Sequence, residues 1–278
     1  MNKRLDTRLR HYRAAVQHPQ AEARFAEKAW RRHNASAASD SLPLLLREDF
    51  AGTASVAAMW TLSHPDRQAM AVDIHADTMQ WADREAAMLM GERAADLHLL
   101  AADVMDVSSP RVDVVISTNF GVLIWHDRAS LVRYFRNVRK SLRPGGVMVM
   151  DLFGGPGAMR PMTQRREVTP DDLAIEPFTY VWEQRRFDAV TSRIDCRIHF
   201  ELPGGRRIRN AFVYDWRLWQ PAEILDAMTE AGLAEPTIWH DAKAAGRMRP
   251  VKRLPQAEDF VIYLTAVKRV VQRESGVV

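Results

Sequence analysis

The chain has 278 residues, of which 47% are hydrophobic and 27% are charged, and its formal net charge is +4. These values are ordinary for a globular protein of one large domain, or of one domain that carries an insertion. The single cysteine, Cys196, excludes an internal disulfide and a cysteine-based zinc site, and it fits a reducing cytoplasm. The chain has no run of about 18 apolar residues and no apolar stretch at its start, so we expect a cytoplasmic protein without a membrane partner.

Residues 4–33 are rich in arginine, and they predict one or two amphipathic helices with a break at His18-Pro19. We expect residues 1–42 to form a helical cap at the N-terminus. The pattern leaves two interpretations open. The cap either packs on the main domain as a purely structural element, or it forms a lid over a cofactor, with Tyr12 facing that cofactor.

A short apolar run at Leu44–Leu46 predicts a buried strand, which leads through Glu48 into a turn of small residues around Gly52. A helix follows and ends near His64-Pro65. Glycine and alanine let a ligand come close to the backbone, and the free N–H groups at the helix start would face it. The pattern therefore predicts a strand, a ligand-facing turn and a helix.

The next predicted strand ends in an acid, Asp73, which lies about 20 residues after the glycine turn. A carboxylate at that spacing can accept hydrogen bonds from both hydroxyls of a ribose. Ile74 would then lie flat against the base. The helix that follows is expected to end at Gly91, because glycine is the preferred residue just after a helix.

Three more apolar strands, at 97–101, 112–117 and 147–153, alternate with helical segments. Five strands that alternate with helices predict a doubly wound, mostly parallel sheet with helices on both faces. Its ligands bind where the strands end. The polar side chains at these strand ends are Glu48, Asp73, Asp103, Asn119 and Asp151.

The segment Glu48-x-x-Ala51-Gly52-Thr53-Ala54 resembles motif I of the class I S-adenosylmethionine (SAM) dependent methyltransferases. Phe50 and Ala54 stand where that motif usually has its first and third glycines. The approach to the fifth strand, a helix followed by Leu-Arg-Pro-Gly-Gly at 142–146, is similar to the same family. The resemblance covers roughly residues 43–153 and 220–268. It implies a seven-stranded sheet whose last strand is antiparallel to the others.

The resemblance also implies SAM as the cofactor and no metal. Glu48 would hold the amino group of SAM, Asp73 the ribose, and Asp103 the adenine amino group, while the Val104 N–H would meet the adenine ring. The residues expected to bind the cofactor are Tyr12, Glu48, Ala51, Gly52, Asp73, Ile74, Asp103, Val104 and Asn119. The main domain would comprise residues 43–153 and 220–278.

Residues 154–219 lie outside the resemblance. Alternating apolar residues and the turn Pro203-Gly204-Gly205 predict an antiparallel β insertion after the fifth strand, which would roof the substrate. Alternation places Tyr214 and Trp216 on one face of the last strand and Arg217 on the other. Arg217 can face the same pocket as Trp216 only if the strand ends there.

The expected reaction is in-line transfer of a methyl group from SAM to a small-molecule acceptor, on nitrogen or oxygen. Asn119 would orient the acceptor, Phe120 would form a wall of the site, and Arg217 would bind a carboxylate of the acceptor. The sequence leaves open an RNA methyltransferase that uses the basic loop 243–253, and a non-catalytic SAM-binding protein. A dehydrogenase would need Gly-x-Gly-x-x-Gly, which is missing here. The oligomeric state is left open.

Overall fold

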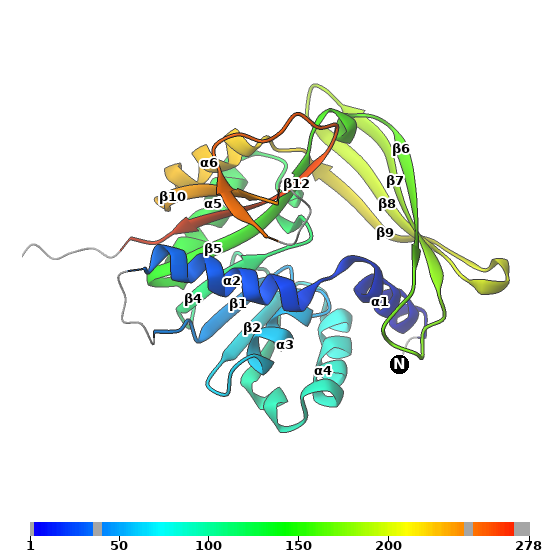
Figure 1. The fold of residues 1–278 in the computed structure, drawn as a ribbon, viewed down its shortest axis with the longest axis horizontal. Helices are drawn as coiled ribbons and strands as arrows, with labels where there is room; N and C mark the ends of the chain where they lie inside the picture. The colour runs from blue at the N-terminus through cyan, green and yellow to red at the C-terminus, as the bar shows by residue number, and fades with distance from the viewer. Residues whose placement is uncertain (1–2, 36–40, 242–246, 270–278) are drawn as a thin grey trace, which may run out of the picture.

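The computed structural model describes residues 3–35, 41–241 and 247–269 and contains two β-sheets (Figure 1). The strands of the larger sheet are β1 (Leu45–Asp49), β2 (Gln68–Asp73), β3 (Leu97–Ala101), β4 (Val112–Ser117), β5 (Leu142–Gly154), β10 (Ala234–His240), β11 (Arg249–Val251) and β12 (Phe260–Val267). The strands of the smaller sheet are β6 (Met162–Val168), β7 (Phe178–Asp188), β8 (Arg193–Glu201) and β9 (Arg207–Arg217).

The α-helices are α1 (Lys3–Val16), α2 (Pro19–His33), α3 (Ser55–Leu62), α4 (Ala76–Met90), α5 (Arg128–Ser141) and α6 (Pro221–Glu230). Four 3₁₀ turns complete the described elements: η1 (Gly91–Asp96), η2 (Gly121–Ile124), η3 (Pro156–Met159) and η4 (Pro203–Gly205). None of the described helices is both long and apolar enough to span a membrane. The predicted break at His18-Pro19 falls between α1 and α2.

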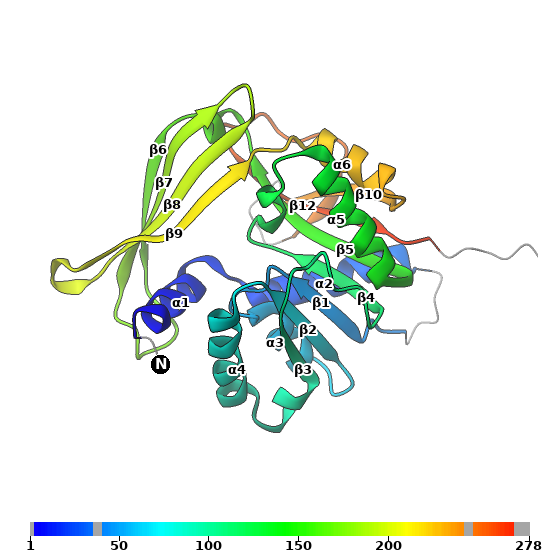
Figure 2. The same ribbon diagram turned by 180° about the vertical axis from the view of Figure 1, so that it is seen from behind.

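The larger sheet has the order β11-β10-β12-β5-β4-β1-β2-β3. Strands β3, β2, β1, β4 and β5 are parallel, and β12 runs antiparallel to β5. Alternate residues of β4 point to opposite faces: Val114 packs among α2, α3 and α4, whereas Val115 packs among α5 and α6. The doubly wound sheet with helices on both faces is therefore confirmed, as Figures 1 and 2 show from opposite sides.

Two strands differ from the sequence expectation. The larger sheet has eight described strands and not seven, because β11 forms within the stretch predicted to be a loop, and it pairs with the edge of β10. Part of that stretch, residues 242–246, lies outside the described residues, as do 36–40 and 270–278. The second unexpected strand is β6, which pairs with β7 at the edge of the smaller sheet.

The smaller sheet is the antiparallel insertion expected after the fifth strand, with the order β6-β7-β8-β9. It leaves the larger sheet at the end of β5 and returns at α6. Helix α1 packs on its apolar face, where the ring of His11 lies 4.6 Å from that of Phe178 and the ring of Tyr12 lies 4.6 Å from that of Phe212. The two N-terminal helices thus lie in different places, since α2 packs on the larger sheet.

A buried ion pair ties β1 to α5. Arg47 Nη2 donates to Asp49 Oδ2 at 2.8 Å, and the hydroxyl of Tyr134 donates to the same oxygen at 2.9 Å. Arg47 Nε and Asp49 Oδ1 lie 2.7 Å apart, outside hydrogen-bond geometry, so they contact as charges only. The remaining guanidinium nitrogen donates to the Val107 carbonyl and the Ser141 hydroxyl, both at 2.6 Å. Both charged side chains are at most 1% exposed.

Candidate active site

The turn after β1 has a left-handed backbone at three positions, although only one of the three is glycine. Phe50, Gly52 and Ala54 have φ values of +56°, +52° and +54°. This left-handed conformation costs roughly 1–2 kcal/mol for a residue with a side chain. The Phe50 ring fits because η2 begins with Gly121, where a Cβ would lie 2.5 Å from Phe50 Cδ2. A Cβ on Gly52 would meet no atom within 4 Å, so the turn faces open space.

The nucleoside end of the expected site is open to solvent. Asp73 Oδ2 accepts the Gly52 N–H and Oδ1 accepts the His75 N–H, both at 2.9 Å, so this carboxylate joins the turn after β1 to the turn after β2. Ile74 is 66% exposed beside it. Asp103 is exposed, whereas Val104 is buried. An exposed apolar side chain next to an oriented carboxylate suits a base stacked beside a ribose.

The turn after β4 is strained and is held by one carboxylate. Asn119 and Phe120 both have positive φ values, +58° and +63°. Their N–H groups donate to Asp151 Oδ2 at 2.9 Å and to Asp151 Oδ1 at 2.8 Å. The Phe120 ring then lies 4.9 Å from that of Phe153 and 6.1 Å from that of Trp216. Asp151 therefore fixes the turn that aims Phe120 at the insertion.

Glu22 is a buried acid at this edge that the sequence interpretation missed. It lies on α2, is 5% exposed, and its Oε2 accepts the Thr118 hydroxyl at 3.0 Å. Glu22 shares the buried stripe of α2 with Ala26 and Ala29, and an acid on an apolar stripe is the signal that could have indicated it. Thr118 directly precedes Asn119, so α2 contacts the turn after β4.

Three carboxyl groups are thus buried at the same edge of the sheet. Burial raises the pKa of Glu22, and it raises the pKa of Glu48 to about 8 and that of Asp151 to about 8. The charge of Glu22 raises the pKa of the other two further. In the described part of the chain, no lysine or arginine forms an ion pair with any of the three. Buried carboxylates without a partner cation are costly, and a bound cation would offset that cost.

Tyr12 and Arg217 occupy different surroundings. Tyr12 lies between α1 and the insertion, hydrogen-bonded to Tyr214, and burial raises the pKa of its hydroxyl. The charges of Glu22 and Asp151 raise that pKa further, so Tyr12 faces the buried acids. Arg217 instead stacks on Trp219, with 3.7 Å between its Cζ and the ring centre.

The guanidinium of Arg217 is also occupied by polar partners. Its Nη1 donates to the His126 carbonyl at 3.1 Å, and its Nη2 donates to Glu223 at 3.3 Å. At the strand ends, hydrogen bonds join Asp73 to Gly52, and Asn119 and Phe120 to Asp151. The contacts of Arg217 are instead with His126, Glu223 and Trp219.

Two surface cavities lie away from these strand ends. One, of about 480 Å³, lies at the opposite edge of the larger sheet, between the starts of β1 and β2. The other, of about 350 Å³, lies on the insertion beside η4. Neither is lined by the buried acids or the strained turns, so the strand ends remain the candidate active site.

No protein-family model matches this sequence, and no curated protein sequence is similar to it. Solved structures are similar in fold. A SAM-dependent methyltransferase from Clostridium acetobutylicum ATCC 824 has a TM-score of 0.67 at 14% identity, over 95% of this chain and 99% of that chain. The sugar N-methyltransferase KedS8 from Streptoalloteichus sp ATCC 53650 has a TM-score of 0.65 at 21% identity, over 94% of this chain and 92% of that chain.

SAM-bound CalS10, an amino pentose methyltransferase from Micromonospora echinaspora, has a TM-score of 0.64 at 16% identity, over 92% of this chain and 94% of that chain. This chain has the fold of the SAM-dependent methyltransferases. Matches of this extent take in most of the insertion as well, so the likeness reaches beyond the segments that carry the sequence resemblance.

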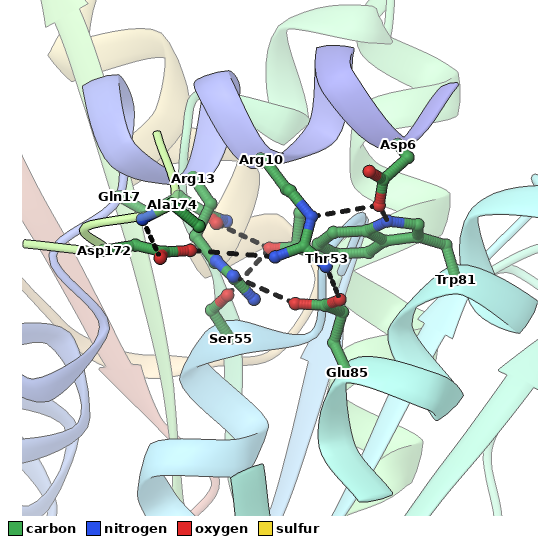
Figure 3. Close-up of polar contacts among 10 residues, drawn as sticks. All are labelled: Asp6, Arg10, Arg13, Gln17, Thr53, Ser55, Trp81, Glu85, Asp172 and Ala174. Carbon is green, nitrogen blue, oxygen red and sulfur yellow. Dashed lines mark hydrogen bonds and ion pairs between the residues drawn. The ribbon is translucent and has the colours of Figure 1, made fainter. Parts of the chain in front are cut away.

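Within this methyltransferase fold, a polar network fastens α1 to the main domain (Figure 3). Glu85 on α4 pairs with two arginines of α1: Arg10 Nη2 lies 2.5 Å from Oε1, and Arg13 Nη2 lies 3.0 Å from Oε2. Asp6 accepts from Arg10 Nε at 3.0 Å and from Trp81 Nε1 at 2.9 Å. These arginines are therefore committed to acids of the protein itself.

Further polar contacts join this N-terminal region to the turn after β1 and to the insertion. The Thr53 hydroxyl donates to Gln17 Oε1 at 2.5 Å and contacts the Ser55 hydroxyl at 2.8 Å. Arg10 also lies 3.7 Å from Asp172 of the insertion. Helix α1 is thus fixed to α4 and to the insertion by polar contacts, and Gln17, directly after α1, contacts the turn that follows β1.

Replacing Glu85 with glutamine should loosen α1, because one carboxylate serves two arginines. We expect the free energy of local opening of α1 to fall by about 1–2 kcal/mol, and amide hydrogen exchange in α1 to accelerate roughly 5- to 30-fold, with β4 and β5 unchanged. Glu92→Gln, an exposed substitution on η1, is the control. Unaltered exchange in α1 would show that apolar packing alone holds this helix.

Proposed function

We propose that this protein binds SAM at the strand ends of the larger sheet and transfers its methyl group to the nitrogen or oxygen of a small molecule. The observation that supports the proposal is a difference between the two ends of the site. One end, at Asp73 and Ile74, is open to solvent, and the other end contains the buried acids Glu22, Glu48 and Asp151. SAM has the same polarity along its length, with a nucleoside at one end and a sulfonium and an ammonium group at the other.

The residues present fit this cofactor. Asp73 would hold the ribose, Ile74 would lie against the adenine, and Asp103 would receive the adenine amino group. Glu48 would hold the ammonium group, directly or through water. The open space at Gly52 leaves room for a ligand close to the backbone. When bound, SAM supplies a methyl group that is already activated by its positive sulfur.

The chain's own contribution is to align the acceptor and to exclude water. Asn119 would orient the acceptor for in-line displacement. Phe120 and Trp216 would form an apolar wall between the turn after β4 and the insertion, which would roof the acceptor. Arg217 would have to leave Glu223 to bind an acceptor carboxylate, so we assign the acceptor-facing positions to Phe120 and Trp216.

The contacts of α1 in the described part of the chain do not favour the RNA alternative. That alternative would use Arg4, Arg8, Arg10 and Arg13 as a phosphate track, and two of these, Arg10 and Arg13, pair with Glu85. It also needs the basic loop 243–253, of which 243–246 lie outside the described residues. Methylation of a small molecule requires neither the α1 arginines nor the loop 243–253.

Calorimetry and label transfer test this function. We expect SAM and its demethylated product, S-adenosylhomocysteine, to bind at micromolar concentrations, and NAD not to bind. Incubation with methyl-labelled SAM and a metabolite extract, in parallel with total RNA, should place label in small molecules only. Binding of NAD without binding of SAM would contradict the cofactor, label only in RNA would contradict the substrate class, and SAM binding with no transfer to either would indicate a non-catalytic protein.

A further inference from the structure

Glu22 differs from the other buried acids in the partners that hold it. Both oxygens of Asp151 accept backbone N–H groups of the turn after β4, and Glu48 accepts the Ala57 N–H of α3 at 2.8 Å. These two carboxylates are built into the fold. The carboxyl group of Glu22 also has a backbone hydrogen bond, with His18 of its own helix start. Its Oε2, however, is bonded to the Thr118 hydroxyl, which can rotate and can also accept a hydrogen bond.

Within residues 3–35, 41–241 and 247–269, the groups whose pKa responds to the charge of Glu22 come from four elements, and none of these groups is a cation. They are Tyr12 on α1, Glu48 on β1, Asp151 on β5 and Tyr263 on β12, each of which senses the charge of Glu22. The surroundings of Glu22 are therefore suited to a second cation, in addition to the cofactor.

A continuous row of aromatic rings runs beside these acids, from the turn after β4 along the insertion to α1. Neighbouring ring centres are 4.1–6.4 Å apart. In order from β5 to α1, the rings are Phe153, Phe120, Trp216, Tyr214, Phe212 and Tyr12. Aromatic faces together with carboxylates recognise an ammonium group, whereas a neutral hydroxyl acceptor requires neither.

We propose that Glu22 holds the positively charged nitrogen of an amine acceptor at the transfer position and takes its proton. The inference rests on the proposed function and narrows it to nitrogen methylation.

In this step the N–H bond of the ammonium breaks, the proton moves to the Glu22 carboxylate, and the nitrogen keeps the electron pair. That pair forms the new N–C bond as the C–S bond breaks, and the electrons of the C–S bond stay on sulfur. The products are a methylated ammonium, S-adenosylhomocysteine and a proton on Glu22, which then passes to solvent. Thr118 keeps the carboxyl group in place throughout.

In sinefungin, an amine-bearing carbon replaces the methylated sulfur of SAM. Sinefungin therefore places a positive charge near the transfer position, and it tests the position of Glu22 even though the acceptor is not identified. The wild-type protein should bind sinefungin roughly ten- to a hundredfold more tightly than neutral S-adenosylhomocysteine, the range of a charge-assisted hydrogen bond. Glu22→Gln should remove most of that preference, while S-adenosylhomocysteine affinity changes less than about twofold. Glutamine can still accept the Thr118 hydrogen bond, so the fold should be retained.

The matched control is Glu27→Gln on the same helix, where the side chain pairs with Arg31 and Arg67 on the other side of α2. This variant should keep the wild-type preference.

The outcomes separate the two proposals. Absence of binding by SAM, sinefungin and S-adenosylhomocysteine would contradict the proposed function itself. If the ligands bind but Glu22→Gln weakens sinefungin and S-adenosylhomocysteine equally, or weakens neither, Glu22 does not hold a charge at the transfer position and the further inference is wrong.

Discussion

Replacing Arg47 with alanine should lower the free energy of unfolding by about 3–5 kcal/mol, because the Asp49 carboxylate would stay buried without its counter-ion. Asp49 would keep only the Tyr134 hydroxyl among the partners described above. The Val107 carbonyl and the Ser141 hydroxyl would lose the Arg47 guanidinium as donor as well. Denaturant titration of both proteins, with the slope held common, would measure the loss.

An exposed ion pair provides the comparison. Arg143 and Asp113 lie 3.1 Å apart, but the arginine side chain is 46% exposed. Arg143→Ala should cost less than about 1 kcal/mol, because solvent screens such pairs. Equal costs for the two alanine variants would show that the ion pair between Arg47 and Asp49 gains nothing from its burial.

Replacing Asp73 with alanine should weaken SAM binding by about 1.5–3 kcal/mol, or roughly 10- to 150-fold. The variant loses the proposed bonds to the ribose and also the bonds that orient the Gly52 and His75 N–H groups. The fold should persist, because Asp73 lies at the end of a strand and is partly exposed. Calorimetric titration with SAM gives the affinity.

Two further substitutions separate charge from general disturbance of this edge. Asp73→Asn keeps the shape and removes the charge, so its affinity should fall between the wild type and Asp73→Ala. Asp77→Ala, an exposed change in the first turn of α4, should leave SAM binding unchanged. Wild-type affinity in a well-folded Asp73→Ala protein would place the ribose elsewhere.

The sequence predicted the doubly wound sheet because its central strands are near-continuous apolar runs separated by helical periods. It did not indicate β6, whose residues Met162–Val168 are mostly polar and exposed, with no alternation to mark a buried face. Strand β11 was also missed, because Arg249–Val251 is only three residues long and contains a proline, which strands tolerate at an edge.

Within the candidate site, the sequence indicated the residues that follow strands, since topology alone brings those together. Glu22 lies outside that rule: its partner, Thr118, is 96 residues away, and only the packing of α2 on the sheet brings them into contact. The left-handed Phe50 could not be predicted either, because its strain is accommodated by Gly121, distant in sequence. For Arg217, alternation indicated the face opposite Trp216, but its partner Glu223 lies on α6 and was not anticipated.

The contact between α1 and the insertion sheet bears on how acceptor specificity could be exchanged between proteins of this fold. The two segments are far apart in sequence, yet the tilted rings of Tyr12 and Phe212 are in contact, and Arg166 of β6 donates to the Ala15 carbonyl. A chimera that receives only a foreign insertion would face a first helix made for another surface. Helix α1 also pairs with Glu85 on α4. A chimera would therefore have to receive α1, the insertion and Glu85 together.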